Sequence, residues 1–360
     1  MSEALVPTAR RALAEALHPI RPSSERLLSS PGVIEAALAE AHWGGVGALL
    51  AHQLDRRGQL AALPEAARQK LRRYVMDAQL AAQAISDTAV QLADALHRAD
   101  VRFVFLKGAA LSRLLYETPW LRPMCDVDVL VDPSRFDTSL EALSEAGFRL
   151  PSPETLTFTR EVSKCVPIAP PGDLDVEVEL HWSIVQEQRQ TVEVDRLFER
   201  AQPLDLGPAR GLALGPVDLL LHQTVHHSYH VFEPKLIWLL DLALLHVRHP
   251  PAESVLAQAR TWGMTVPLAL SVLHLEKVFP GTVQEEIVAA ARHQRRAGLL
   301  ARLGADPDPF TLLRGWKSPK TQLIWKLLTL DRPRQMASQL AAWTSRARRH
   351  GARPGEVVTI

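Results

Sequence analysis

The chain has 360 residues, with 41 Lys and Arg against 40 Asp and Glu, and a formal net charge of +1 at pH 7. This length allows two or three lobes around a sizeable core, and a net charge near zero excludes a strong overall attraction to nucleic acid. Two cysteines exclude a disulfide framework and a cysteine-based zinc site. No apolar run reaches the ~18 residues of a membrane-spanning helix, and the N-terminal segment has no continuous apolar stretch, so we expect a reduced, cytoplasmic protein.

Residues 1–97 are predicted to form an N-terminal helical lobe. Ser30 and Pro31 are typical of a helix start, because a serine hydroxyl caps free backbone N–H groups and proline suits the first turn. The glycine pair at 44–45 ends this helix. A long Ala-rich helix over 64–99 carries apolar residues at spacings of three to five, which indicates core packing rather than a ligand site.

Residues 98–205 alternate between strand and helix patterns, which predicts an α+β core with a small mixed sheet. A Pro-rich stretch at 166–172 is expected to be a loop. The predicted elements are strands at 102–106, 126–131 and 173–182 and helices at 109–116 and 133–146.

Two aspartates one residue apart are the most informative feature of this core. Asp126 and Asp128 alternate with the strand-forming residues Val127 and Val129, so both carboxylates are expected on one face of a strand. Carboxylates that close repel each other unless a cation lies between them. Mg²⁺ or Mn²⁺, with phosphate oxygens as further ligands, is the predicted occupant.

A third carboxylate is expected from the later predicted strand. Asp175, Glu177 and Glu179 alternate with apolar residues and share one face, from which one of them can act as a metal ligand or a general base. Glu179 is our choice because it lies nearest to His181 and Trp182. The alternative is that this acidic face is simply solvated.

A Lys-Gly turn follows the first predicted strand. Lys107 and Gly108 precede the predicted helix that begins at Ala109, whose free N–H groups favour anions, so the turn from Lys107 to Ala109 is expected to hold nucleotide phosphates. The alternative for Lys107 is an exposed turn residue without a ligand.

Helical patterns return over residues 212–350, after a Gly- and Pro-containing boundary at 206–216, and leave a short tail at 351–360. Charge is unevenly distributed: residues 126–205 hold seventeen acidic against seven basic residues, whereas 287–360 hold fourteen basic against four acidic. The acidic region suits a metal site. The basic region either faces a polyanion or is a set of solvated helix surfaces.

The first helix of this C-terminal lobe is rich in histidine. His222, His226 and His230 recur every four residues, near one helical face. Three hypotheses remain open: a zinc site, a polar wall of a substrate cleft, and ordinary packing. The usual zinc-binding pattern has a glutamate beside its first histidine, and this chain has Gln223 at that position.

Several of these motifs together resemble the uncharacterised nucleotidyltransferase family of the polymerase-β-like nucleotidyltransferase superfamily. The resemblance covers roughly residues 30–250. The matching residues are Leu106-Lys107-Gly108, Tyr116, Arg122, the run from Asp126 to Val131, Glu179-Leu180-His181-Trp182 and Trp238-Leu239-Leu240-Asp241.

This resemblance implies a nucleotidyltransferase core between helical lobes, and transfer of a nucleoside monophosphate from an NTP to an acceptor hydroxyl with release of pyrophosphate. The implied catalytic and metal-binding residues are Asp126, Asp128 and Glu179. The implied nucleotide-binding residues are Lys107, Gly108, Ala109 and Arg122. The expected acceptor cleft contains His181, His226, His230, Lys235 and Asp241.

One position departs from the family pattern. Ala109 follows Gly108, where the superfamily usually has a second glycine or a serine whose hydroxyl contacts the triphosphate. A catalytically silent nucleotide-binding or interaction protein on the same fold is therefore the second hypothesis, and a hydrolase based on the histidine helix is the third. Because the chain lacks an RNA-stacking aromatic motif, we expect a small-molecule or peptide acceptor rather than nucleic acid.

Overall fold

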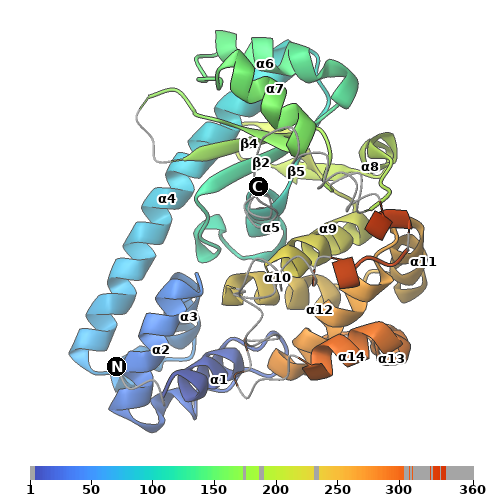
Figure 1. The fold of residues 1–360 in the computed structure, drawn as a ribbon. Helices are drawn as coiled ribbons and strands as arrows, with labels where there is room; N and C mark the ends of the chain where they lie inside the picture. The colour runs from blue at the N-terminus through green and yellow to red at the C-terminus, as the bar shows by residue number, and fades with distance from the viewer. Residues whose placement is uncertain are drawn as a thin grey trace.

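A computed structural model describes residues 5–172, 176–185, 190–230 and 235–303, followed by 308, 310, 325, 327–332 and 334–337. Asp175 and the tail at 351–360 therefore lie outside the described residues. The chain folds around one mixed six-stranded sheet, with helices above, below and beside it (Figure 1).

The sheet has the strand order β3-β4-β2-β1-β6-β5. β2 and β4 are parallel, as are β1 and β6, whereas the pairs β1–β2, β3–β4 and β5–β6 are antiparallel. The strands are β1 (Phe103–Phe105), β2 (Asp126–Val131), β3 (Cys165–Ile168), β4 (Glu177–His181), β5 (Gln202–Asp205) and β6 (Arg210–Ala213).

Alternation along β2 separates the two faces of the sheet. Val127, Val129 and Val131 are fully buried in one apolar cluster with residues of α4 (Glu65–Arg98) and α6 (Phe136–Glu145). Asp126 and Asp128 consequently project from the other face, toward the C-terminal helices. The side chain of Leu130, on that same face, belongs to the larger core that the two helical lobes share.

The N-terminal helices form one lobe at the lower end of the long helix α4 (Figure 1). The Ser30 hydroxyl accepts a hydrogen bond from the Val33 backbone N–H at 3.3 Å, as expected for a helix cap. The elements are α1 (Val6–Ala16), η2 (Leu27–Ser29), α2 (Pro31–Trp43), α3 (Gly47–Arg56), η3 (Leu60–Ala62) and α4.

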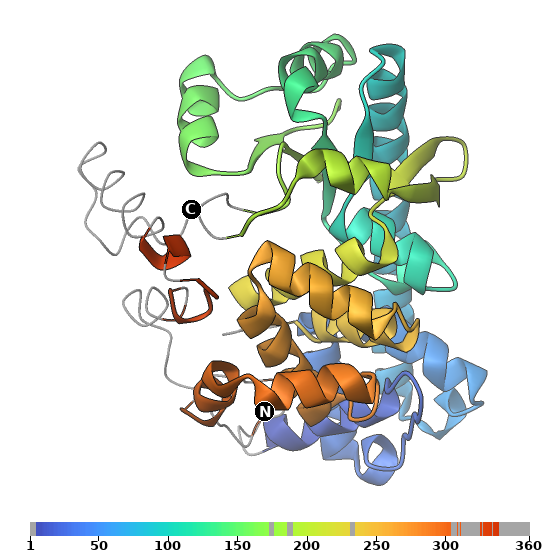
Figure 2. The same ribbon diagram turned by 90° about the vertical axis from the view of Figure 1, so that its right-hand side faces the viewer.

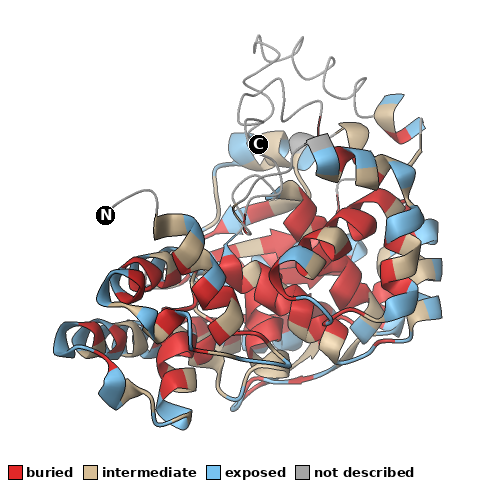
Figure 3. Ribbon diagram, turned by 90° about the horizontal axis from the view of Figure 1, so that it is seen from below, coloured by how far each residue is buried: buried red, intermediate tan, exposed pale blue. Residues whose placement is uncertain are grey.

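The C-terminal helices stack beneath the sheet, seen from the side in Figure 2. Buried residues run through the middle of the molecule, and exposed residues collect at its outside (Figure 3). No helix among the described residues is long and apolar enough to cross a membrane. The helices are α9 (Pro216–Tyr229), α10 (Leu236–Val247), α11 (Ala252–Trp262), α12 (Thr265–Val278), α13 (Glu285–His293) and α14 (Arg295–Leu303).

Smaller elements connect the strands of the core. α5 and η4 lie between β1 and β2, η5 leads into α6, and α7 and α8 flank the β3–β4 pair in the chain. Their bounds are α5 (Lys107–Leu115), η4 (Pro119–Leu121), η5 (Pro133–Arg135), α7 (Pro153–Val162) and α8 (Val194–Glu199).

The predicted α+β class with helical flanks is confirmed, but three strands were missed. The loop expected at 166–172 contains most of β3, which tolerates Pro167 because it is an edge strand and a proline there costs no internal ladder bond. The boundary expected at 206–216 contains β6, which pairs with β1 and adds the hairpin β5–β6 to the sheet. Short strands completed by distant partners leave little periodicity in the sequence.

Candidate active site

Parallel pairing of β2 with β4 brings the two acidic faces together. Asp126 is opposite Glu177 and Asp128 is opposite Glu179 in the register, so their side chains stand on the same face of neighbouring strands. Asp128 is fully buried, Glu179 is partly buried and Glu177 is exposed. Glu179 is therefore the acid of β4 that lies beside the buried aspartate.

Lys107 lies between these carboxylates. Its Nζ donates to Asp128 Oδ1 at 2.5 Å and to Glu179 Oε2 at 3.1 Å. Lys107 is the first residue of α5 rather than the last of the preceding strand, and its φ is +38°, a left-handed conformation that costs a non-glycine residue about 1–2 kcal/mol. Such strain persists only where surrounding contacts hold the residue in place.

His181, the last residue of β4, completes the group. Its Nε2 is 3.0 Å from Asp128 Oδ1 and 3.2 Å from Glu179 Oε2, and the ring is fully buried. The two carboxylates thus share two nitrogen partners, Lys107 Nζ and His181 Nε2. They lie close enough together for one small cation to contact both.

These contacts set the charge of the group. Burial opposes the charged amine of Lys107, but the carboxylates of Asp128 and Glu179 outweigh it and raise the lysine pKa. The hydrogen bond from His181, opposed by burial and helped by Lys107, holds the pKa of Glu179 well below its usual range. Burial and the neighbouring charge of Asp128 raise the pKa of Asp126. Glu179 is consequently a better cation ligand than proton acceptor.

The turn at the start of α5 is closely packed. A Cβ added to Gly108 would lie 2.6 Å from Arg122 Nη1 and 3.1 Å from Met124 Sδ, so only glycine fits there. The Ser112 hydroxyl, one turn further, donates to the Ala109 carbonyl at 3.4 Å and does not replace a serine at position 109. Backbone N–H groups are what this turn offers to an anion.

Arg122 and Asp241 form a buried ion pair instead of lining an open surface. Arg122 Nε and Nη2 donate to both carboxylate oxygens of Asp241, the closest contact being 2.8 Å, and the residues are 5% and 0% exposed. The Tyr116 hydroxyl donates to Asp241 Oδ1 at 2.7 Å. The Tyr, Arg and W-x-x-D parts of the sequence pattern thus meet in one network, next to Gly108.

The histidine helix α9 presents different histidines to different neighbours. The pKa values of His222 and His226 are lowered by burial first and then by nearby positive charges, which for both include Lys107 and Lys164. These two rings therefore lie within electrostatic reach of Lys107 and Lys164. His227 points elsewhere: its Nδ1 is 2.9 Å from Ser271 Oγ in the helical core.

The outer end of this helix is an aromatic cluster. The rings of His226 and His230 are 4.6 Å apart, and each lies within 5 Å of the Trp238 ring. Lys235 Nζ lies 5.6 Å from the same indole, and its charge also acts on the thiol of Cys125, which precedes Asp126. Among the described residues the helix histidines form no group of three converging metal ligands.

Lys164 was not identified from the sequence. Its Nζ donates to the Ile184 carbonyl at 3.0 Å and lies 5.9 Å from the Tyr229 ring. Burial, together with the charge of Lys107, lowers its pKa to about 8. Lys164 precedes β3, and because that strand was missed, no sequence signal connected this lysine with the site.

The mixed sheet presents D-x-D and a third carboxylate on adjacent strands, beside a helix start and between helical lobes, which is the arrangement that the resemblance to nucleotidyltransferases implies. A family model described as uncharacterised nucleotidyltransferase matches residues 31–280, well over half of the chain. The chain belongs to this family, which confirms the resemblance found in the sequence and assigns it to the transferases. No curated protein matches the chain.

Proposed function

We propose that the chain is a metal-dependent nucleotidyltransferase that moves a nucleoside monophosphate from an NTP to a hydroxyl of a small molecule or peptide and releases pyrophosphate. One observation carries this proposal: the parallel register that sets Asp126 and Asp128 beside Glu179 on one sheet face. In-line phosphoryl transfer depends on positioning and charge neutralisation, and this face provides both.

The residues present fit a hard divalent cation such as Mg²⁺ or Mn²⁺. Asp126, Asp128 and Glu179 offer carboxylate oxygens, the ligands that such ions prefer. Asp128 Oδ2 is buried and has no hydrogen-bond partner among the described residues, which leaves a ligand atom uncommitted. When bound, the cation would neutralise phosphate charge and polarise the phosphorus centre.

Lys107 and the backbone of the Gly108 turn would bind the triphosphate. The Lys107 ammonium now neutralises two carboxylates, so a cation bound there would release this side chain toward an anion at the start of α5. Arg122, pinned by Asp241, is a positioning residue that holds the turn rather than a direct phosphate ligand.

The acceptor would bind between the carboxylates and α9. His226, His230 and Lys235 lie around the Trp238 ring, and together they offer polar and aromatic contacts suited to a small polar molecule. His181 would hold Asp128 and Glu179 in register rather than contact the acceptor, because its ring is fully buried.

The test is incubation with each of the four NTPs, Mg²⁺ or Mn²⁺ and a cell extract, with pyrophosphate release measured and products identified by mass spectrometry. Glu179→Gln should abolish release, whereas Glu177→Gln, a matched change at the exposed acid of the same strand face, should retain it. If both variants lose pyrophosphate release equally, the assignment of Glu179 as the third metal ligand is wrong. Absence of release with every NTP and either metal would refute the proposal.

Ala109 and the Lys107 ion pairs favour a second candidate, a silent nucleotide-binding protein, because the lysine already fills the space between the carboxylates. The two candidates differ in one measurement. A silent protein would bind an NTP, as detected by calorimetry, without releasing pyrophosphate at any metal concentration.

A further inference from the structure

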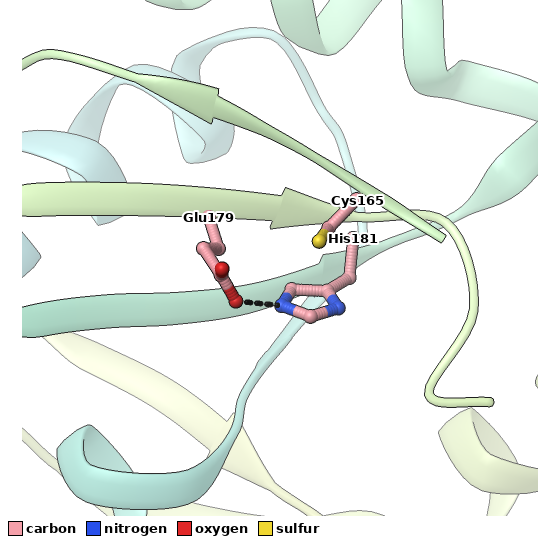
Figure 4. A group of neighbouring side chains, drawn as sticks. All are labelled: Cys165, Glu179 and His181. Atoms are coloured by element: carbon pink, nitrogen blue, oxygen red, sulfur yellow. Dashed lines mark hydrogen bonds and ion pairs between the residues drawn. The ribbon is translucent and has the colours of Figure 1, made fainter. Parts of the chain in front are cut away.

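A second group of potential metal ligands stands next to the carboxylates and differs from them in chemistry. Cys165 of β3 is directly opposite His181 of β4 in the antiparallel register, and Glu179 lies two residues before that histidine. All three side chains therefore project from one face of the sheet. Figure 4 shows them converging, and one ligand atom from each lies within 4.8 Å of the other two.

The spacing is close to that of a tetrahedral site. Zinc bonds of about 2.0–2.3 Å place neighbouring ligand atoms about 3.2–3.8 Å apart. His181 Nε2 and Glu179 Oε2 are already 3.2 Å apart. The Cys165 sulfur lies within 4.8 Å of one ligand atom of each of these residues, and it contacts Ser163 Oγ at 3.8 Å.

The surroundings of His181 also permit metal binding. The ring is fully buried, and its Nδ1 has no hydrogen-bond partner among the described residues. When the imidazole proton resides on Nδ1, the Nε2 contacts with Asp128 and Glu179 are given up and the Nε2 lone pair is free for a metal. A sulfur, nitrogen and oxygen set selects zinc-like ions and not Mg²⁺.

We propose that Cys165, Glu179 and His181 bind one thiophilic divalent cation of the zinc class, and that this binding switches off nucleotidyl transfer. Glu179 belongs to both groups and cannot serve both metals with the same geometry. Binding at the sulfur site would also take His181 Nε2 from Asp128 and compete with Lys107 for Glu179. The inhibitory half of this proposal rests on the proposed function, whereas the metal site does not.

The site is tested on the full chain with Co²⁺ as a spectroscopic substitute for Zn²⁺. One equivalent of Co²⁺ should give the near-ultraviolet thiolate-to-cobalt band and the strong visible bands of tetrahedral cobalt, and Zn²⁺ should abolish both. Cys165→Ala should lose the thiolate band and bind Zn²⁺ at least about tenfold more weakly. Cys125→Ala is the matched control, because it removes the only other cysteine, and it should keep the wild-type spectrum.

Inhibition is tested separately, as the Zn²⁺ concentration that halves pyrophosphate release in excess Mg²⁺, with each variant compared with its own zinc-free rate. This concentration should rise at least about tenfold in Cys165→Ala and stay unchanged in Cys125→Ala. A thiolate band that is absent from the wild type or persists in Cys165→Ala overturns the site. Binding without inhibition overturns the switch. If no transfer occurs under any condition but the band behaves as expected, the metal site stands and the inhibitory role falls with the proposed function.

Discussion

At the residue scale, the site is a largely buried group of carboxylates whose negative charge is partly neutralised by Lys107. Lys107 neutralises two carboxylates, while Asp126 retains a raised pKa because burial and Asp128 disfavour its charge. A structure that only needed stability would gain nothing from three carboxylates on one face. The arrangement supports the proposed cation site, where the Lys107 ammonium now neutralises part of the carboxylate charge.

Asp128→Asn should reduce transfer by at least about 10²-fold, because it removes charge that the metal and the transition state require. The amide can still accept from Lys107 and His181, so the melting temperature should change by no more than about 4 °C. Pyrophosphate release and thermal unfolding measure the two effects.

Asp218→Asn is the matched control for that variant. Asp218 is 1% exposed and bonded to Arg200 at 2.8 Å, at the start of α9 and outside the carboxylate group. It should lose about 1–3 kcal/mol of stability and keep its turnover number. If Asp128→Asn unfolds instead, or transfers at the wild-type rate, its assignment is wrong.

His246 should make the fold sensitive to acid. The residue is fully buried in α10, both ring nitrogens lack partners among the described residues, and burial lowers its pKa to about 4. Between pH 6.5 and about 4 the unfolded chain binds the proton more readily than the folded one, so stability is lost as pH falls through this window.

His246→Leu should therefore lose less stability than the wild type between pH 7 and pH 4, by up to about 3 kcal/mol at 1.36 kcal/mol per pKa unit. Urea unfolding at several pH values measures this difference. His293→Gln, a change at an exposed histidine, should keep the wild-type dependence. Parallel curves for wild type and His246→Leu would contradict the assignment.

At the element scale, the start of α5 is the feature on which the nucleotide site depends. Gly108 packs against Arg122, and Arg122 cannot move aside because Asp241 holds its guanidinium. The strained Lys107 precedes this glycine and aims its amine at β2 and β4. The geometry of the turn thus depends on contacts from η4 and α10 as well as on the helix itself.

Gly108→Ala should cost about 1–3 kcal/mol of folding stability through overpacking, and should raise the KM for the NTP by displacing the turn. Gly298→Ala is the control, because a Cβ at that position in α14 meets nothing within 4 Å. It should be neutral or stabilise the protein by about 0.5–1 kcal/mol. Chemical unfolding measures the stability of both variants, and steady-state kinetics measure their KM for the NTP. If the two variants have equal stability and equal KM, the turn is not tightly packed.

At the scale of the whole molecule, one buried network ties the core to the C-terminal lobe. Tyr116 and Arg122 come from the segment between β1 and β2, and both bind Asp241 of α10. The pKa of Tyr116 is raised by burial and by the charge of Asp241, so the tyrosine remains a neutral donor. The network holds α10 against the segment between β1 and β2.

Removing one partner of this pair should be costly. Arg122→Met or Asp241→Leu alone should lose about 3–5 kcal/mol, since each leaves a buried charge unpaired. The double variant should lose less than the sum of the two, by at least about 1.5 kcal/mol. A double-mutant cycle from urea unfolding measures the coupling, and additive losses would show that the ion pair does not join the lobes.

The sequence by itself determined the α+β class, the helical flanks, the D-x-D strand and the acidic strand beside it. These are local patterns, because each depends only on residues that are close together in the sequence. They are the period-two alternation at Asp126 and Glu179, the capping at Ser30 and the apolar spacing along α4. The family resemblance rested on the same short motifs, and the family match over residues 31–280 agrees with it.

Only the tertiary structure decided which of these residues meet. The parallel register of β2 and β4 selected Glu179 over Glu177 as the neighbour of Asp128, and the edge strand β3 brought Lys164 and Cys165 to the site. Arg122 and Asp241, which the motifs suggested as ligand contacts, are paired with each other in the core. Strand pairing and burial bring together residues more than a hundred positions apart. Contacts between such distant residues stabilise the fold but produce no periodic pattern in the sequence.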